Sequence, residues 1–167
     1  MSLGKNAIGK RFRYPDNYIV EREKIREYAV AVKNDDPPFH EEKAAEELGY
    51  DGLMAPLTFI SVFGYRAVAA FFEWANIATN DAQVVQVDQS LKFFAPIKVG
   101  DRLYCDVEIE SVRRAHGTDI IMTKQTITND AGDIVQETYT TLAGRAGDYG
   151  EVGFRDATAL VRFGQGG

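Results

Sequence analysis

The longest apolar run of this 167-residue chain is Leu53-Met54-Ala55-Pro56-Leu57-Thr58-Phe59-Ile60-Ser61-Val62-Phe63-Gly64-Tyr65-Arg66-Ala67-Val68-Ala69-Ala70-Phe71-Phe72. Pro56 fixes its own φ and lacks an N–H, so it favours the first turn of a helix. Apolar side chains then follow on every face, and a helix that is apolar all round is buried. We therefore predict a buried helix over residues 57–72 that the rest of the fold surrounds.

A polar stretch lies shortly before this run and reads Asn34-Asp35-Asp36-Pro37-Pro38-Phe39-His40. The prolines prevent a helix, so the side chains of Asp35 and His40 can meet only across a tight loop. A carboxylate beside an imidazole forms an acid–base unit near neutral pH. Asn and Asp before proline are also ordinary turn residues, and His40 is then a surface side chain. Both interpretations are open at this point.

The rest of the chain predicts one α+β domain. Residues 21–33 and 41–48 have the spacing of amphipathic helices, and Gly49 follows the second as a cap. Alternating patterns predict strands over residues 83–93 and 103–112, and β-branched residues predict one over 120–128. Residues 134–142, after a hairpin turn, are expected to form the last strand, and a short strand is expected near 18–20. An antiparallel sheet of about five strands would wrap around the buried helix, and its open edge would favour a second subunit. We assign residues 4–146 to this domain and 147–167 to a flexible tail.

Composition excludes several classes of protein. The net charge of −6 argues against nucleic-acid binding. The apolar run reaches the roughly 20 residues of a membrane span only if Pro56 and Arg66 are counted, so a core helix is favoured. One cysteine and two histidines cannot build a typical zinc site, so no metal is expected. The single Cys105 suits a reducing cytosol, and the N-terminus shows no apolar leader, which predicts a cytoplasmic protein.

Several motifs carry a resemblance that covers nearly the whole chain. They are Arg13-Tyr14-Pro15-Asp16 with Glu21-Arg22-Glu23-Lys24-Ile25-Arg26-Glu27, Ala55-Pro56-Leu57-Thr58-Phe59, Val85-Gln86-Val87-Asp88-Gln89, Pro96-Ile97-Lys98-Val99-Gly100-Asp101 and Gln136-Glu137-Thr138-Tyr139-Thr140-Thr141-Leu142. The chain resembles the MaoC-like (R)-specific enoyl hydratases and (3R)-hydroxyacyl-thioester dehydratases. It is most similar to the A- and C-type subunits of the mycobacterial (3R)-hydroxyacyl-ACP dehydratase. This resemblance implies a single hot dog fold.

The hydratase signature of that family is Gly-Asp-x-Asn-Pro-(apolar)-His, in which Asp and His are catalytic. Asp35 and His40 occupy those two positions, and Pro38 and Phe39 match the residues between them. The chain departs from the signature at the Gly and Asn positions, which hold Asn34 and Pro37. The resemblance thus implies that Asp35 and His40 are the catalytic pair, while the departures put full activity in doubt.

The implied reaction interconverts (3R)-3-hydroxyacyl and trans-2-enoyl thioesters of coenzyme A or acyl-carrier protein, in fatty-acid metabolism and without a cofactor. The backbone N–H of Leu57, at the N-terminus of the buried helix, would stabilise the enolate oxygen that develops on the thioester. Large apolar side chains could line an acyl tunnel or simply form the core: Phe59, Phe63, Phe71, Phe72 and Trp74. The expected assembly is a homodimer, or a heterodimer with a homologous subunit.

Three alternatives remain from the sequence. The first is a non-catalytic subunit that binds the acyl chain while a partner supplies the catalytic pair; the A-type subunits usually lack the His that this chain has. The second is a hot dog thioesterase, which would place an acid within the buried helix, whereas this helix has none before Glu73. The third is an acyl-binding module without chemistry.

Overall fold

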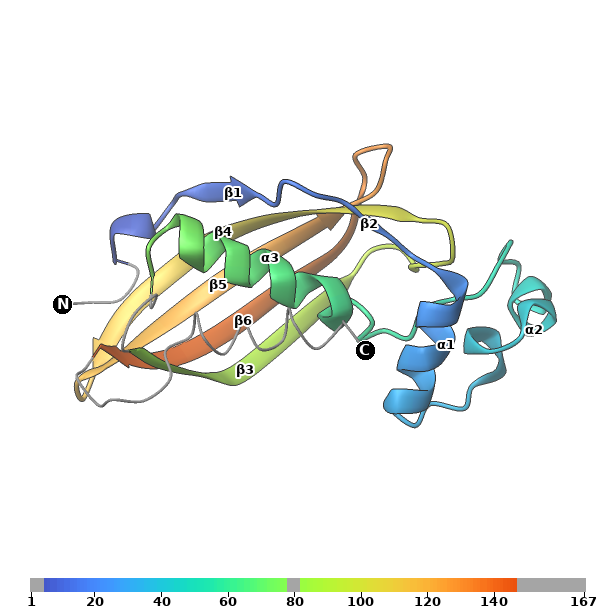
Figure 1. Cartoon of the computed structure of the whole chain (residues 1–167), viewed down its shortest axis with the longest axis horizontal. Helices are drawn as coiled ribbons and strands as arrows, with labels where there is room; N and C mark the ends of the chain where they lie inside the picture. The colour runs from blue at the N-terminus through green and yellow to red at the C-terminus, as the bar shows by residue number, and fades with distance from the viewer. Residues whose placement is uncertain (1–4, 78–81, 147–167) are drawn as a thin grey trace, which may run out of the picture.

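The computed structural model describes residues 5–77 and 82–146, and Figure 1 shows an antiparallel sheet with one long helix packed along it. The helices are η1 (Lys5–Ala7), α1 (Arg22–Ala31), η2 (Pro37–Phe39), α2 (Glu42–Glu47) and α3 (Ser61–Trp74). The strands are β1 (Arg11–Arg13), β2 (Tyr18–Ile19), β3 (Ala82–Phe93), β4 (Arg102–Ala115), β5 (Thr118–Thr128) and β6 (Ile134–Ala146). All the strands predicted from the sequence are present, and β1 is additional.

The sheet has the order β1-β4-β5-β6-β3, and β2 also pairs with β4. Neighbouring strands are antiparallel throughout. Strands β4, β5 and β6 form a meander, but β3 pairs with β6 rather than with β4, which follows it in sequence. As a result β3 lies at one edge of the described sheet, and one side of its backbone has no strand partner among the described residues.

Helix α3 begins at Ser61, not at Leu57 as the position of Pro56 predicted. Residues 57–60 instead form tight turns, in which the N–H of Phe59 donates to the Pro56 carbonyl at 2.9 Å and that of Ser61 to Thr58 at 3.0 Å. The N–H of Ala55 donates to the Ile97 carbonyl at 2.8 Å, so the chain is held beside the loop that precedes β4 before it can turn into the helix. The sequence prediction was therefore wrong about where the helix begins.

One side of α3 supplies much of the core. Its buried residues are Phe63, Gly64, Ala67, Val68, Ala69, Phe71 and Phe72. They pack with inward residues of the sheet, among them Leu103, Val107 and Ile127. Other parts of its surface are open: Tyr65 is 42 % exposed and Trp74 is 52 % exposed. Burial on every face, which the apolar pattern predicted, is therefore wrong at these positions.

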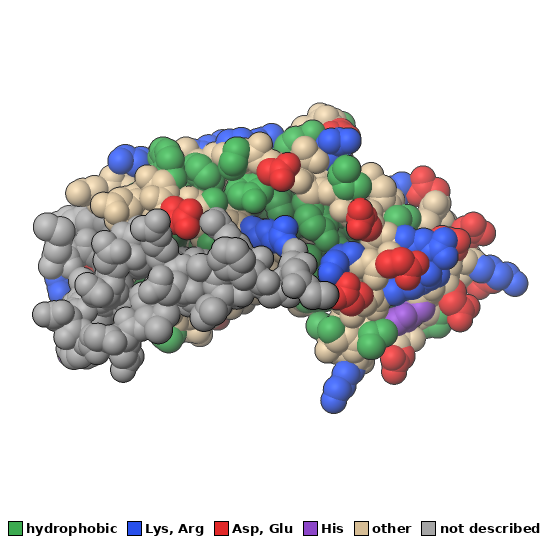
Figure 2. Space-filling view, in the orientation of Figure 1, with side chains coloured by type: hydrophobic (Ala, Val, Ile, Leu, Met, Phe, Trp, Pro, Cys, Tyr) green, Lys and Arg blue, Asp and Glu red, His purple; other side chains and the backbone are tan. Residues whose placement is uncertain are grey.

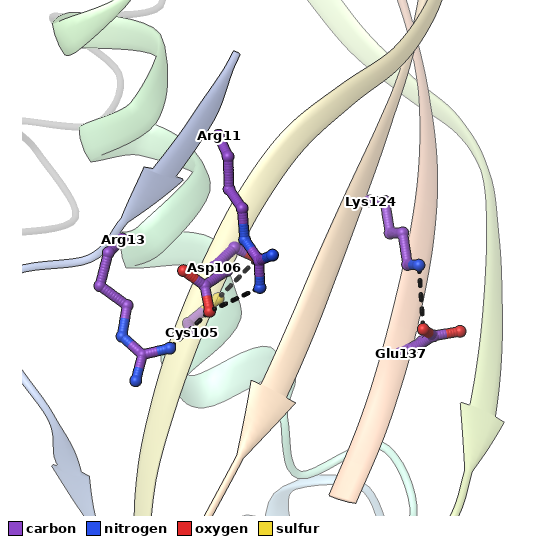
Figure 3. A network of polar contacts seen from close by, with 6 residues as sticks. All are labelled: Arg11, Arg13, Cys105, Asp106, Lys124 and Glu137. Atoms are coloured by element: carbon purple, nitrogen blue, oxygen red, sulfur yellow. Dashed lines mark hydrogen bonds and ion pairs between the residues drawn. The ribbon is translucent and has the colours of Figure 1, made fainter. Parts of the chain in front are cut away.

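On the outer face of the sheet, several charged side chains of neighbouring strands form ion pairs. Figure 3 shows Arg11 and Arg13 of β1 converging on Asp106 of β4, and Lys124 of β5 facing Glu137 of β6. In the space-filling view, charged side chains of both signs crowd the lobe formed by α1 and α2 (Figure 2). No helix among the described residues is long and apolar enough to cross a membrane.

Candidate functional site

The loop after α1 is shaped by its backbone. Lys33 has a left-handed conformation with φ of 57°, which reverses the chain after the helix. The N–H of Asn34 then donates to the Ala29 carbonyl at 2.9 Å, and the Asn34 side chain accepts from the N–H of Asp36 at 3.1 Å. The prolines set the short helix η2 directly afterwards. The loop is therefore tight, as the sequence predicted.

The structure brings Asp35 and His40 into this one loop but does not join their side chains. The Nε2 atom of His40 lies 2.8 Å from the backbone carbonyl oxygen of Asn34. Asp35 is exposed, and within residues 5–77 and 82–146 its carboxylate forms no hydrogen bond or ion pair. A joint acid–base role for the two residues stays a prediction.

Helix α1 and the segment before α3 hold the loop from both sides. Arg26 donates from Nε to the His40 carbonyl at 2.9 Å, and the N–H of Met54 donates to the Pro38 carbonyl at 3.1 Å. Leu57 is 65 % exposed, and its N–H has no acceptor among the described residues. A free N–H at this position is what the predicted oxyanion role requires, and that role stays a prediction.

A mouth cavity of about 330 Å³ opens beside these turns. It is lined by Tyr50, Met54, Ala55, Pro56, Leu57, Phe93, Phe94, Ala95, Pro96, Ile97 and Gln136. Most of these side chains are apolar, and neither Asp35 nor His40 is among them. The cavity therefore brings the Leu57 turn and the end of β3 together at one opening.

An inner cavity of about 430 Å³ lies between α3 and the inner faces of β3, β5 and β6. It is lined by Ile60, Ser61, Gly64, Tyr65, Val68, Val84, Gln86, Gln89, Gln125, Thr138, Thr140 and Leu142. Gln136 of the mouth cavity and Thr138 of the inner cavity are successive inward residues of β6, and their side chains are 3.5 Å apart in a hydrogen bond. The two cavities thus follow one another along β6.

The aromatic residues predicted to line an acyl tunnel lie elsewhere. Phe59, Phe63, Phe71 and Phe72 are buried in the core, Trp74 is exposed, and none of the five borders either cavity. The inner cavity uses another face of α3, where Ser61 and Gly64 are three residues apart. Small residues at that spacing were the available signal in the sequence, because they leave space beside a helix.

The floor of the inner cavity contains a buried amide. Gln125 of β5 is 4 % exposed and donates from Nε2 to the Gly64 carbonyl at 2.8 Å. The same nitrogen lies 3.8 Å from Sγ of Cys105. Burial raises the pKa of the Cys105 thiol to about 12, so this cysteine is protonated and unreactive in the folded chain. Gln125 therefore ties the helix to the sheet below it.

Charged groups near the mouth cavity are paired with one another. Lys98 contacts the carboxylate of Asp51, and this hydrogen bond lowers the pKa of Asp51 and raises that of Lys98. Burial raises the pKa of Asp101, whose carboxylate accepts from the backbone N–H of Lys98 at 2.9 Å. The described residues contain no cluster of three side chains that could hold a metal ion. The described site offers a ligand an apolar mouth cavity, backbone N–H groups, and the hydroxyl and amide side chains that line much of the inner cavity.

A curved antiparallel sheet around one central helix, with cavities between the two, defines a hot dog protein. The chain belongs to the FAS1-like dehydratase family, whose model for the dehydratase domain region matches residues 6–138. A UPF0336 protein of Mycolicibacterium paratuberculosis is 69 % identical over 159 residues, which are 95 % of this chain and 100 % of that protein. These matches confirm the predicted family resemblance.

Solved structures confirm the fold. A chain of the HadBC (3R-hydroxyacyl-ACP dehydratase) complex of Mycobacterium tuberculosis superposes with a TM-score of 0.78 and 43 % identity, over 84 % of this chain and 99 % of that one. The MaoC-like dehydratase of Rhodospirillum rubrum gives a TM-score of 0.69 over 89 % of this chain and 99 % of its own. At 19 % identity the second match supports the hot dog fold alone.

Proposed function

We propose that this chain is one subunit of a heterodimeric (3R)-hydroxyacyl-thioester dehydratase of fatty-acid metabolism, and that it binds the acyl chain while a homologous partner supplies the acid–base pair. One observation carries this choice: Nε2 of His40 is engaged by the Asn34 carbonyl. A carbonyl oxygen only accepts, so Nε2 must carry a proton and donate it. Nε2 is then unable to remove a proton from substrate, and of the two ring nitrogens only Nδ1 keeps a lone pair that could accept one.

The surroundings of Asp35 support the same proposal. A carboxylate assists an imidazole when it accepts the proton of one ring nitrogen and holds the ring in place. Here the ring is held by a backbone carbonyl instead, and the Asp35 carboxylate is exposed to solvent. The Asn34 and Pro37 departures from the family signature lie in the same loop, which fits a loop that has a structural role.

The two cavities fit an acyl thioester. The inward residues of β6 run from Gln136 to Leu142, and the six steps along the chain between them span roughly 20 Å of extended strand. This track passes both cavities, so a long acyl chain could extend from the Leu57 turn into the space under α3. In the proposed complex the N–H of Leu57 donates to the thioester carbonyl, and the partner's pair removes the C2 proton and protonates the leaving C3 hydroxyl.

The open edge of β3 is the proposed partner surface. Val85 and Val87 are 60 % and 57 % exposed on this strand, and Phe93 and Phe94 continue the apolar surface beyond them. A strand edge with apolar side chains and free backbone groups is suited to pairing with another strand. The relative in the HadBC complex is a component of an assembly of two subunits, and homologous pairing is the corresponding proposal here.

The test is hydration of trans-2-dodecenoyl-CoA, followed as loss of enoyl absorbance. The purified chain alone should bind this thioester without hydrating it, and should acquire activity when co-expressed with a homologous subunit that has the intact signature. His40→Ala and Asp35→Asn in this chain should then change the activity of the complex by less than about threefold. A chain that neither binds the thioester nor supports the partner would overturn the proposal.

A self-sufficient hydratase with Asp35 and His40 as its catalytic pair is the second candidate. It is favoured by the hydrogen bond between the Met54 N–H and the Pro38 carbonyl, which holds the loop against a residue of the mouth cavity. The same assay decides between the two. Activity of the chain alone, lost by about a hundredfold or more in both His40→Ala and Asp35→Asn, would establish this candidate in place of the first.

A further inference from the structure

Tyr28 of α1 makes a contact with the turn before α3 that neither the family signature nor the proposed mechanism uses. Its hydroxyl donates to the backbone carbonyl of Thr58 at 2.8 Å, and the same oxygen lies 2.9 Å from the Thr58 Oγ1. A phenol both donates and accepts, so backbone and side chain of one residue are held by a single hydroxyl. The contact joins residues thirty positions apart.

The ring of Tyr28 is held against the core, while its hydroxyl contact lies at an exposed position. The tyrosine ring packs edge-on against Phe59, with ring centroids 5.5 Å apart at 82°. Phe59 is fully buried, and α1 is anchored by two buried residues, Ile25 and Ala29. A hydroxyl on a ring that is packed in this way keeps its position, so it can fix the orientation of the peptide it binds.

The turn that Tyr28 holds contains a free backbone donor beside the mouth cavity. The carbonyl of Thr58 is engaged by Tyr28 and by the N–H of Ser61, and that of Pro56 by the N–H of Phe59. By contrast, the N–H of Leu57 has no acceptor among the described residues, and Leu57 lines the mouth cavity. Each peptide is planar, so the Thr58 carbonyl fixes the Phe59 N–H of the same peptide. That N–H holds the Pro56 carbonyl, whose peptide contains the N–H of Leu57.

We infer that Tyr28 is a positioning residue, which holds the 57–60 turn so that the N–H of Leu57 meets the carbonyl of a bound acyl thioester. The inference rests on the proposed function for its ligand. Two positions earlier on the same helix, Arg26 holds the His40 carbonyl at 2.9 Å. Helix α1 therefore sets the relative position of the His40 loop and the Leu57 turn, and it contributes no side chain to either cavity.

Tyr18 provides a matched control. Its ring also packs edge-on against Phe59, with centroids 6.1 Å apart at 62°, and stacks on Phe63 at 5.5 Å. Its hydroxyl has no hydrogen-bond partner among the described residues. Tyr28→Phe and Tyr18→Phe thus remove the same atom from two rings that contact the same phenylalanine, but only the first removes a bond to the turn.

The first measurement is hydrogen exchange on the purified full chain without ligand. In Tyr28→Phe, amides of the 54–63 segment should exchange about fivefold faster than in the wild type, which is the scale of one lost hydrogen bond. Tyr18→Phe should leave that segment unchanged. Equal exchange in the wild type and Tyr28→Phe would overturn the inference, whatever the chain binds.

The second measurement is made with trans-2-dodecenoyl-CoA labelled with ¹³C at its carbonyl. Bound to the wild type and to Tyr18→Phe, the carbonyl stretch should fall in frequency, because a donated hydrogen bond weakens the bond. In Tyr28→Phe the band should return toward its position in water and thioester affinity should fall about fivefold, while affinity for decanoate stays within twofold. An unchanged band or an equal loss of affinity for both ligands would refute positioning of the carbonyl. Absence of thioester binding in every variant would instead refute the proposed function, and the exchange result would stand by itself.

Discussion

Replacing Gly64 with alanine tests the tie between α3 and the sheet. A Cβ atom built on Gly64 would lie 2.9 Å from Nε2 and 3.4 Å from Oε1 of Gln125. The amide is the end of a flexible side chain, but it is 4 % exposed and donates to the Gly64 carbonyl at 2.8 Å. Gln125 cannot move away from the new methyl group without giving up that hydrogen bond.

The change in the free energy of unfolding combines two destabilising contributions and one stabilising contribution. Losing a buried hydrogen bond costs about 1–3 kcal/mol. Forcing one extra carbon into a packed site costs about 1–3 kcal/mol. Alanine in place of glycine within a helix returns about 1 kcal/mol. The free energy of unfolding should therefore fall by about 1–5 kcal/mol in Gly64→Ala, despite the better helix propensity of alanine.

Equilibrium urea denaturation at a fixed protein concentration measures this change. Ala70→Gly, elsewhere in α3, reports the propensity contribution alone and should destabilise by about 1 kcal/mol. In a Gln125→Ala background, where the obstructing amide is absent, Gly64→Ala should cost little or become stabilising. The reasoning is refuted if Gly64→Ala stabilises the native chain, or if its effect is the same with and without the Gln125 side chain.

Three further predictions concern other parts of the molecule. The hydrogen bond from Lys124 lowers the pKa of Glu137, so this glutamate stabilises the fold above the ordinary glutamate pKa and loses its contribution as the pH falls through the lowered value. The difference in unfolding free energy between wild type and Glu137→Gln should therefore be present at pH 7 and vanish in acid. A difference that is constant with pH would contradict this. Because burial raises the pKa of Cys105 to about 12, a disulfide reagent at pH 8 should label this thiol only as fast as the chain unfolds. Immediate stoichiometric labelling would show that the thiol is accessible in the folded chain. Val87→Lys on the open edge of β3 should leave the circular dichroism spectrum unchanged but weaken subunit association at least tenfold in sedimentation velocity, whereas association like that of the wild type would remove β3 from the interface.

Local patterns predicted the strands well but not their pairing. The β-branched residues of 120–128 predicted β5 to within two residues at its start and to Thr128 at its end. The Asn129–Asp133 turn that follows connects β5 to β6 as expected. The placement of β3 beside β6 depends on how a whole sheet closes around α3, and nothing within residues 82–93 specifies it.

The candidate site was predictable in its parts and not in their contacts. The prolines before His40 indicated a tight loop. The direction of the imidazole, however, depends on the left-handed backbone at Lys33, and a lysine in the sequence does not predict that conformation. The inner cavity was missed because its inward strand residues are polar, namely Gln125 of β5 and Thr138 and Thr140 of β6. Alternation of apolar and polar residues marks the buried face of a strand only when that face is apolar.

The edge of β3 that has no strand partner among the described residues bears on the relative amounts in which the proposed subunits should be made. Among the described residues, one edge of this twelve-residue strand has no strand partner and its valines are exposed, so it is suited to pairing with a complementary edge. In the proposed heterodimer, assembly with the partner would compete by mass action with self-association of surplus subunits. Unequal synthesis of the two subunits would then lower the yield of the complex, and balanced synthesis would favour it.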